Sequence, residues 1–163
     1  MKRLLFAMAG LALVSLTGCG VHCPCERDVL NVEAKLPDGS AANVPQALDW
    51  RVISSSVDRA HQTMAVLTGN DLAVKFAGTG AYPDGSELAL VTWLERDDPH
   101  WFGARIPGSF VGLERVTVTR GTDGKLTTSY KRYAGEPLHE ATDVANSDAR
   151  KAAILGMVYS QMP

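Results

Sequence analysis

The chain has 163 residues and a formal net charge of −2 at pH 7, and 45% of its residues are hydrophobic. This length and composition are those of one folded domain with a core of its own. The basic residues form no cluster or stripe, which argues against nucleic-acid binding and against charge-driven attachment to anionic lipid.

The first 18 residues have the organisation of a secretory signal. Lys2 and Arg3 form a basic head, an apolar run extends from Leu4 to Leu16, and small residues follow. The run is shorter than the roughly 20 residues of a membrane-spanning helix. The order Leu-Thr-Gly-Cys ending at Cys19 matches the lipobox of bacterial lipoproteins, in which cleavage leaves a lipid-modified cysteine as the N-terminus.

We therefore expect a lipoprotein that begins at Cys19 and is anchored by acyl chains such as palmitate, because several chains hold a protein on a membrane more firmly than one. Removal of 18 residues leaves 145 and takes away two basic residues, so the charge becomes −4. Gly20 stands where an aspartate would mark retention in the inner membrane. The expected location is the outer membrane, facing the periplasm, with residues 19–28 as a tether and 29–163 as one domain. A non-lipidated signal ending in cysteine is the alternative.

All three cysteines lie within seven residues. With Cys19 lipidated, Cys23 and Cys25 can form a disulfide with each other or with another molecule in an oxidising compartment. With His22 they are also weak candidates for a soft-metal site suited to Cu(I) or Zn(II). A Cys-x-Cys pair alone has too few ligands for structural zinc, so we expect no metal site. The cysteine order does not match a c-type haem attachment motif.

Before Gly69 the sequence predicts one strand and one helix. Residues Leu30–Leu36 alternate apolar and polar side chains with a period of two, which predicts a strand. Asp58 can cap a helix that continues to Leu67 and ends at Gly69. The loosely alternating run that begins at Trp50 fits either a strand or an arm before this helix, and we predict the arm.

The region Gly69–Pro107 carries the clearest local signals. Asn70 or Asp71 can cap a short helix, and Gly78 can take the left-handed conformation past its end. The following Tyr-Pro-Asp-Gly-Ser predicts a β-turn. Residues Glu87–Glu95 then predict a central strand that is covered on both faces.

The stretch GNDLAVKFAGTGAYPDGSELALVTW, continued by DPHWFGARIP, resembles the cytochrome P-460 domain family in its Gly-Asn-Asp helix and its Pro-Asp-Gly strand. The resemblance covers most of the mature domain, implies the family's fold and makes a homodimer through an exposed sheet face plausible. In haem-bearing members a Cys-x-x-Cys-His motif near the C-terminus attaches the haem and supplies its axial histidine, and a lysine forms another cross-link. No cysteine follows Cys25, so that attachment motif is missing. Lys75, in the predicted helix, is interpreted as a solvated lysine.

The loop His100-Trp101-Phe102 places two aromatic residues side by side. Such residues are expected to be buried, either against the core or across a partner surface. We favour packing into the core, and a ligand pocket at this loop is the alternative.

The C-terminal third predicts a β-hairpin and a helix. Phe110–Arg120 and Leu126–Tyr133 are the strands, joined at Asp123-Gly124, and residues 146–148 can cap the last helix. We expect an α+β fold, with an antiparallel sheet of about four to five strands and helices packed on one face. Its strands would be these two, Glu87–Glu95, and the one near Leu30.

Two functions remain open from the sequence. The first is a haem-free binding or envelope-interaction lipoprotein with an unknown small-molecule ligand, no expected cofactor and no enzymatic activity. The second is a redox protein that holds haem non-covalently, for which the resemblance implies hydroxylamine or nitric oxide as the compound oxidised or bound. Its axial ligand would come from His139, His100 or His61. For His139 and His61 we favour a solvated side chain over a ligand. No catalytic residue is identified.

The lipid anchor gives the first prediction. Replacing Cys19 by serine is expected to abolish acylation and to alter processing of the signal, because only the cysteine thiol accepts the lipid. Metabolic labelling with a radioactive fatty acid and membrane fractionation measure the outcome. Unchanged labelling of the Cys19→Ser variant would contradict the prediction, and a Cys25→Ser variant serves as the matched control.

Overall fold

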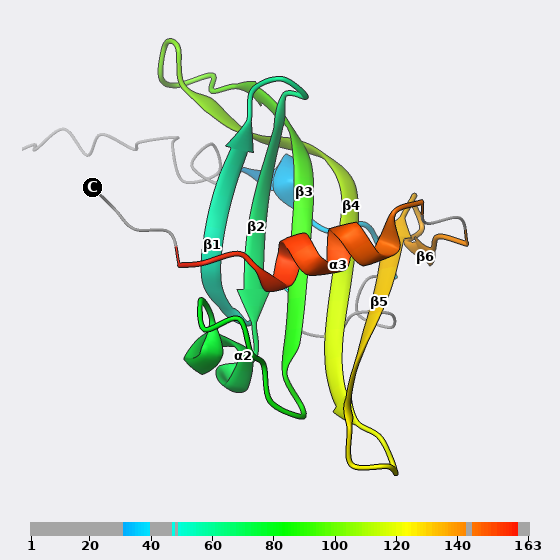
Figure 1. Ribbon diagram of the computed structural model, residues 1–163. Coiled ribbons are helices and arrows are strands. Elements are labelled where there is room, and N and C mark those ends of the chain that lie inside the picture. The colour runs from blue at the N-terminus through cyan, green and yellow to red at the C-terminus, as the bar shows by residue number, and fades with distance from the viewer. Residues whose placement is uncertain (1–30, 40–46, 48, 143–144, 160–163) are drawn as a thin grey trace, which may run out of the picture. The chain divides into compact units, whose positions relative to one another are not determined.

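The computed structural model describes residues 31–39, 47, 49–142 and 145–159, so the predicted signal, the tether and all three cysteines lie outside the described residues. Within the described part, six antiparallel strands form one sheet in the order of the sequence (Figure 1). They are β1 (Arg51–Asp58), β2 (Thr63–Gly69), β3 (Glu87–Asp97), β4 (Arg105–Arg120), β5 (Leu126–Ala134) and β6 (His139–Glu140).

Strand β3 is a central strand that is buried on both faces, as the sequence predicts. It pairs with β2 on one side and with β4 on the other, and Leu88 and Leu90 face the opposite side from Ala89 and Val91. All four are at most 3% exposed. A strand that is buried on both faces needs apolar side chains pointing to each face. This explains why the apolar residues of β3 are consecutive instead of alternating with polar ones.

Two helices cover one face of the sheet. They are α2 (Asp71–Phe76) and α3 (Ser147–Leu155), and Figure 1 shows α3 crossing the strands on this face. Ile154 of α3 is fully buried in the same cluster as Leu67, Leu88 and Val116. Complete burial of an isoleucine side chain stabilises a fold by about 1.5–3 kcal/mol.

The opposite face is covered by the N-terminal part of the domain. A short 3-10 helix, η2 (Val32–Ala34), belongs to this segment. Ala34, Leu36 and Trp50 pack around a second buried cluster that includes Trp93 and Leu113. The helices therefore occupy one face, as predicted, and irregular chain occupies the other.

The short helix α2 confirms the predicted capping. The side chain of Asn70 accepts a hydrogen bond from the backbone N–H of Ala73 (3.0 Å) and donates one to the carbonyl of Gly85 (2.8 Å). Gly78 has a φ of +78°, the left-handed conformation expected past the helix end. Asn70 thus joins the helix to the turn before β3.

The predicted helix from Asp58 to Leu67 is wrong, because this segment is a β-hairpin made by β1 and β2. Asp58 does accept hydrogen bonds from backbone N–H groups, at Ala60 (3.0 Å) and His61 (3.2 Å), but it closes a turn instead of starting a helix. Thr63 and Val66 in this run are β-branched, and such residues favour strands. The arm predicted at Trp50 is likewise replaced by β1.

The predicted strand near Leu30 is also wrong where the structure describes it. Residues 32–34 form η2, closed by a hydrogen bond from the N–H of Ala34 to the carbonyl of Asn31 (3.2 Å). Val32 is 69% exposed while Ala34 and Leu36 are partly buried. A segment lying across a sheet can alternate in burial without pairing as a strand, which is why the period of two is misleading here.

The C-terminal predictions are confirmed with small shifts. Strand β4 begins five residues earlier than predicted, β5 matches within one residue, and Gly124 in their turn has a φ of +79°. Helix α3 begins at Ser147, but Asn146 takes a left-handed φ of +60° and its side chain makes no capping bond. The fold is α+β, with six strands in place of the four to five expected. None of the helices in the described residues is long and apolar enough to span a membrane.

Packing of α3 gives the second prediction. Replacing Ile154 by alanine is expected to lower the free energy of unfolding by about 2–5 kcal/mol, because a fully buried side chain leaves a cavity. Urea denaturation measures the change. The matched control is Leu126→Ala, at a side chain that is 47% exposed, where the change should stay within about 0.5 kcal/mol. Similar effects of the two substitutions would contradict the described packing.

Candidate functional site

A buried carboxylate marks the point where α3 meets the sheet. Glu114 lies on β4, on the same face of the strand as Val116 and Val118. It therefore faces the helices, and it is only 7% exposed. The guanidinium of Arg150, on α3, contacts both carboxylate oxygens, with Nε 2.9 Å from Oε1. The hydroxyl of Tyr130, on β5, donates a third hydrogen bond to Oε1.

The three groups fix one another's protonation state. Burial alone would raise the pKa of Glu114, but the hydrogen bonds from Arg150 and Tyr130 outweigh it and hold the pKa below its ordinary value. Burial, together with the hydrogen bond to Glu114, raises the pKa of Tyr130 to about 12. Near pH 7 the cluster therefore consists of a carboxylate, a neutral phenol and a guanidinium.

A cavity of about 260 Å³ opens beside this cluster. Thr92 of β3, Gly112 of β4 and Arg132 of β5 point to the same face of the sheet and line this cavity. Asn146, which precedes α3, lines it as well. Arg132 is the direct neighbour of Glu114 across the β4–β5 ladder. A Cβ at Gly112 would lie 3.4 Å from the Tyr133 carbonyl oxygen and 3.8 Å from Nε of Arg132, which places the glycine directly beside that guanidinium. The full lining is Thr92, Val111, Gly112, Glu114, Tyr130, Arg132, Ala145, Asn146 and Arg150.

The charges around the cavity do not balance. Glu114 is neutralised by Arg150, and among the described residues no carboxylate forms an ion pair with Arg132. Two guanidinium groups and one carboxylate leave a surplus of one positive charge. The cavity is thus suited to a small molecule with a negative group.

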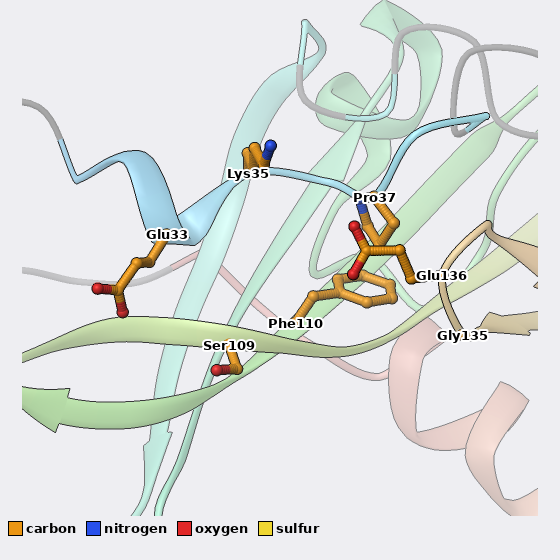
Figure 2. Close-up of a pocket in the computed structure, with 7 residues that line it drawn as sticks. All are labelled: Glu33, Lys35, Pro37, Ser109, Phe110, Gly135 and Glu136. Carbon is orange, nitrogen blue, oxygen red and sulfur yellow. The ribbon is translucent and has the colours of Figure 1, made fainter.

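Figure 2 shows a second cavity, of about 410 Å³, lined by residues of the η2 segment, β4 and the turn after β5. Its carboxylates are Glu33 and Glu136, its cation is Lys35, and the ring of Phe110 lies below Glu136 in this view. All three charged residues are exposed, and Glu33 pairs with Arg96 at 3.1 Å. Exposed charges are well hydrated. The arginines of the cavity at Glu114 are exposed too, but that cavity also contains a buried, hydrogen-bonded carboxylate, which the second cavity lacks.

A third hollow of about 540 Å³ lies at the end of the sheet where the β1–β2 and β3–β4 turns meet. It is lined by Val57, Arg59, Gln62, Met64, Glu95, Gly103 and Arg105. The charged residues among them are at least partly exposed, and none is a buried carboxylate like Glu114. We therefore take the cavity at Glu114 as the candidate site.

The structure does not bring the predicted histidines together at a site. His61 lies in the β1–β2 turn with Nδ1 2.7 Å from Asp58, and His100 lies in the β3–β4 turn with Nδ1 3.4 Å from Asp98. His139 is in β6, with Nδ1 3.2 Å from the carbonyl of Pro137. All three are exposed and none lines the three cavities.

The prediction that Trp101 and Phe102 pack into the core is wrong. Trp101 is 72% exposed and Phe102 is fully exposed, because the turn that carries them extends beyond the sheet. Neither residue lines a cavity described above, so the alternative of a ligand pocket formed by this loop gains no support. Lys75 is exposed on α2, in agreement with its interpretation as solvated.

The weak metal candidates His22, Cys23 and Cys25, like the lipidation site Cys19, lie outside the described residues. Within the part of the chain that the structure does describe, no three His, Cys, Asp or Glu side chains gather as a metal site would require.

The sequence analysis missed Glu114, although a signal was present. The residue lies in the order Leu113-Glu114-Arg115-Val116 and shares its side of the strand with the apolar Val116 and Val118. A carboxylate at such a position has to find buried partners, since leaving it unpaired costs several kcal/mol. The partners themselves, 16 and 36 residues away, could not be read from local sequence.

No protein-family model matches the chain, and no curated protein is significantly similar to it. The resemblance to the cytochrome P-460 family therefore remains a prediction that rests on the residues from Gly69 to Pro107.

The third prediction concerns Glu114 and pH. A carboxyl with a lowered folded pKa contributes stability that is present above its ordinary pKa of 4.5 and lost as pH falls through the folded value. Glu114→Gln is expected to weaken this acid dependence. At pH 7 it should lower the free energy of unfolding by about 2–3 kcal/mol, less than for a fully buried pair because Arg150 is half exposed.

Urea denaturation at pH 7 and pH 3 measures both effects. The matched control is Glu140→Gln, which removes an exposed carboxylate paired with Lys131 and should change stability by less than about 1 kcal/mol. Equal acid dependence of the Glu114→Gln variant and the unchanged protein would contradict the buried ion pair.

Proposed function

We propose that this protein is a lipid-anchored, periplasm-facing binding protein that holds a small acidic molecule in the cavity between α3 and the sheet. The observation that carries the proposal is the surplus positive charge at the cavity, where Arg132 stands beside an already neutralised Glu114. The lipobox at Cys19 supports the anchor.

The lining supports recognition of a carboxylate. The guanidinium of Arg132 presents a planar fork of N–H donors that matches two carboxylate oxygens. The hydroxyl of Thr92 and the amide of Asn146 line the same cavity and can hydrogen-bond the remaining polar atoms. The volume of about 260 Å³ is below the roughly 300–1,000 Å³ of drug-sized pockets, which favours a ligand of few heavy atoms.

The same chemistry favours binding over catalysis. General acid–base catalysis needs a group whose pKa lies near the working pH. Glu114 stays ionised because its pKa is lowered, and Tyr130 stays protonated because its pKa is about 12. Both groups are also engaged with each other, so neither is available to move a proton for a bound molecule.

The fourth prediction tests ligand binding. Isothermal titration calorimetry of the purified protein with acetate, succinate and glutamate is expected to detect binding of at least one of them. Arg132→Gln should weaken that binding at least tenfold, which corresponds to about 1.4 kcal/mol and the loss of a charge-assisted contact. Arg59→Gln, at an exposed arginine of the β1–β2 turn, is the matched control and should change affinity less than twofold.

Two results would overturn the proposal. One is binding of the carboxylates with equal affinity by the Arg132→Gln variant, and the other is no detectable heat with any of the three.

The fifth prediction separates this function from haem-based redox chemistry. Covalent c-type haem needs two thiols and a histidine, and no cysteine follows Cys25. Protein expressed with its signal in a host that matures cytochromes c should contain no haem that survives acid-acetone extraction. Haem that resists extraction would contradict the prediction. Extractable haem in stoichiometric amount would favour the redox function, and His100 and His139 would then be substituted to find its axial ligand.

A further inference from the structure

The turn between β3 and β4 presents two aromatic side chains to solvent. We call Trp101 and Phe102 the aromatic tip; Trp101 is 72% exposed and Phe102 is fully exposed. A hydrogen bond from the N–H of Ala104 to the carbonyl of Trp101 (3.0 Å) closes a β-turn, in which Gly103 takes a φ of +76°. Phe102 occupies the outer corner of this turn, where its side chain projects away from the sheet.

Hydrogen bonds and an ion pair hold the residues on both sides of the aromatic tip in a defined conformation. The N–H of Asp98 donates to the carbonyl of Ala104 (3.0 Å), and the Asp98 carboxylate accepts a hydrogen bond from the N–H of His100 (2.8 Å). Asp97 and Arg105 pair across the hairpin at 3.1 Å. The exposure is therefore a property of a defined turn, and contact with a surface would cost little additional ordering of the backbone.

The N-terminal segment enters the domain at the base of this same hairpin. Asn31, the first described residue, donates a hydrogen bond to the carbonyl of Pro107 and accepts one from Arg96 (3.1 Å). Arg96 also pairs with Glu33 at 3.1 Å. Arg96 and Pro107 belong to the paired part of β3 and β4 that leads directly to the aromatic tip.

The expected membrane anchor joins the described domain through Asn31, which contacts the hairpin that carries the aromatic tip. Asn31 is twelve positions after Cys19 in the sequence, and an extended chain of that length spans at most about 40 Å, which limits the distance between the lipid and Asn31. Asn31 contacts the hairpin that carries the aromatic tip, while the β4–β5 hairpin lies at the other end of the sheet (Figure 1).

We infer that Trp101 and Phe102 insert into the headgroup region of a zwitterionic phospholipid surface and orient the domain on the membrane. Tryptophan favours this region because its ring is apolar and its N–H can meet polar headgroups. Two aromatic side chains bury about 150–250 Å² each, well below the roughly 800 Å² per partner of a stable protein interface, whereas a bilayer requires no matching shape.

The net charge near the aromatic tip favours zwitterionic over anionic lipid headgroups. Residues 95–105 contain three carboxylates and two arginines, so their formal charge is −1 with histidine neutral. An anionic lipid surface would repel this hairpin, and a zwitterionic one would not. The choice of phosphatidylcholine as the test lipid follows from this charge.

The experiment places the domain on a membrane whether or not natural lipidation occurs. The described fold lies within residues 31–159, so the chain from Cys19 onward retains it. With Cys23→Ser and Cys25→Ser, Cys19 is the single thiol and can be coupled to a maleimide lipid in phosphatidylcholine vesicles with brominated acyl chains. Trp101 emission is obtained by comparison with a Trp101→Phe variant, because Trp50 and Trp93 also fluoresce.

Insertion predicts that the brominated chains quench at least half of the Trp101 emission. Free partitioning of the Cys19→Ser chain into the same vesicles should fall at least tenfold when Trp101→Ala and Phe102→Ala are combined. Leu126→Ala, at an exposed apolar residue of the opposite hairpin, is the matched control and should change partitioning less than twofold. Urea denaturation checks that the double variant folds. If it does not, the single variant Phe102→Ser replaces it, and its partitioning into the vesicles should fall at least threefold.

Three results would overturn the inference. They are unquenched Trp101 in the coupled protein, quenching that requires phosphatidylglycerol, and a dimer in lipid-free solution that dissociates when Trp101 and Phe102 are replaced. None of these measurements depends on natural acylation at Cys19 or on carboxylate binding near Arg132. The membrane inference can therefore fail while the proposed function holds, and the proposed function can fail while the membrane inference holds.

Discussion

Burial of the Glu114 carboxylate is the constraint on which the helix face of this protein depends. A charge at a core position of β4 must be paired, and Arg150 can reach it only if α3 lies across the sheet above β4 and β5. Tyr130 completes the arrangement from β5. Because Arg150 neutralises the Glu114 carboxylate, the positive charge of Arg132 at the cavity has no paired carboxylate among the described residues. We propose that this charge binds the ligand. One ion pair thus both docks the helix and sets the sign of the candidate site.

The two functional proposals use different parts of one architecture. The cavity at Glu114 lies on the helix face, over the middle of the sheet. The aromatic tip lies at one end of the sheet, on the hairpin that also receives the N-terminal segment through Asn31 and Arg96. Thr92 and Gly112 line the cavity from the same hairpin whose turn carries the aromatic tip. The turn can therefore contact a surface while the face of the sheet remains open to small molecules.

The errors of the sequence-based interpretation have a common cause. Asp58 caps a turn as readily as a helix, since both offer free N–H groups two and three residues later. Met64 and Leu67 share one side of a helix but opposite faces of a strand, and only pairing of β2 with β3 decides between these arrangements. The burial of Trp101 and Phe102 was inferred from their apolar character alone, although a turn can project such residues away from every other element.

The sequence alone determined the features that depend on a few adjacent residues: the helix capped by Asn70, the turns at Gly78 and Asp123-Gly124, and the strands β3, β4 and β5. Such features form from hydrogen bonds and φ preferences that span about four residues. Only the tertiary structure decided the β1–β2 hairpin, the exposed aromatic tip and the pairing of Glu114 with Arg150. Those outcomes depend on strand register and on contacts up to 36 residues apart, which local propensities do not encode.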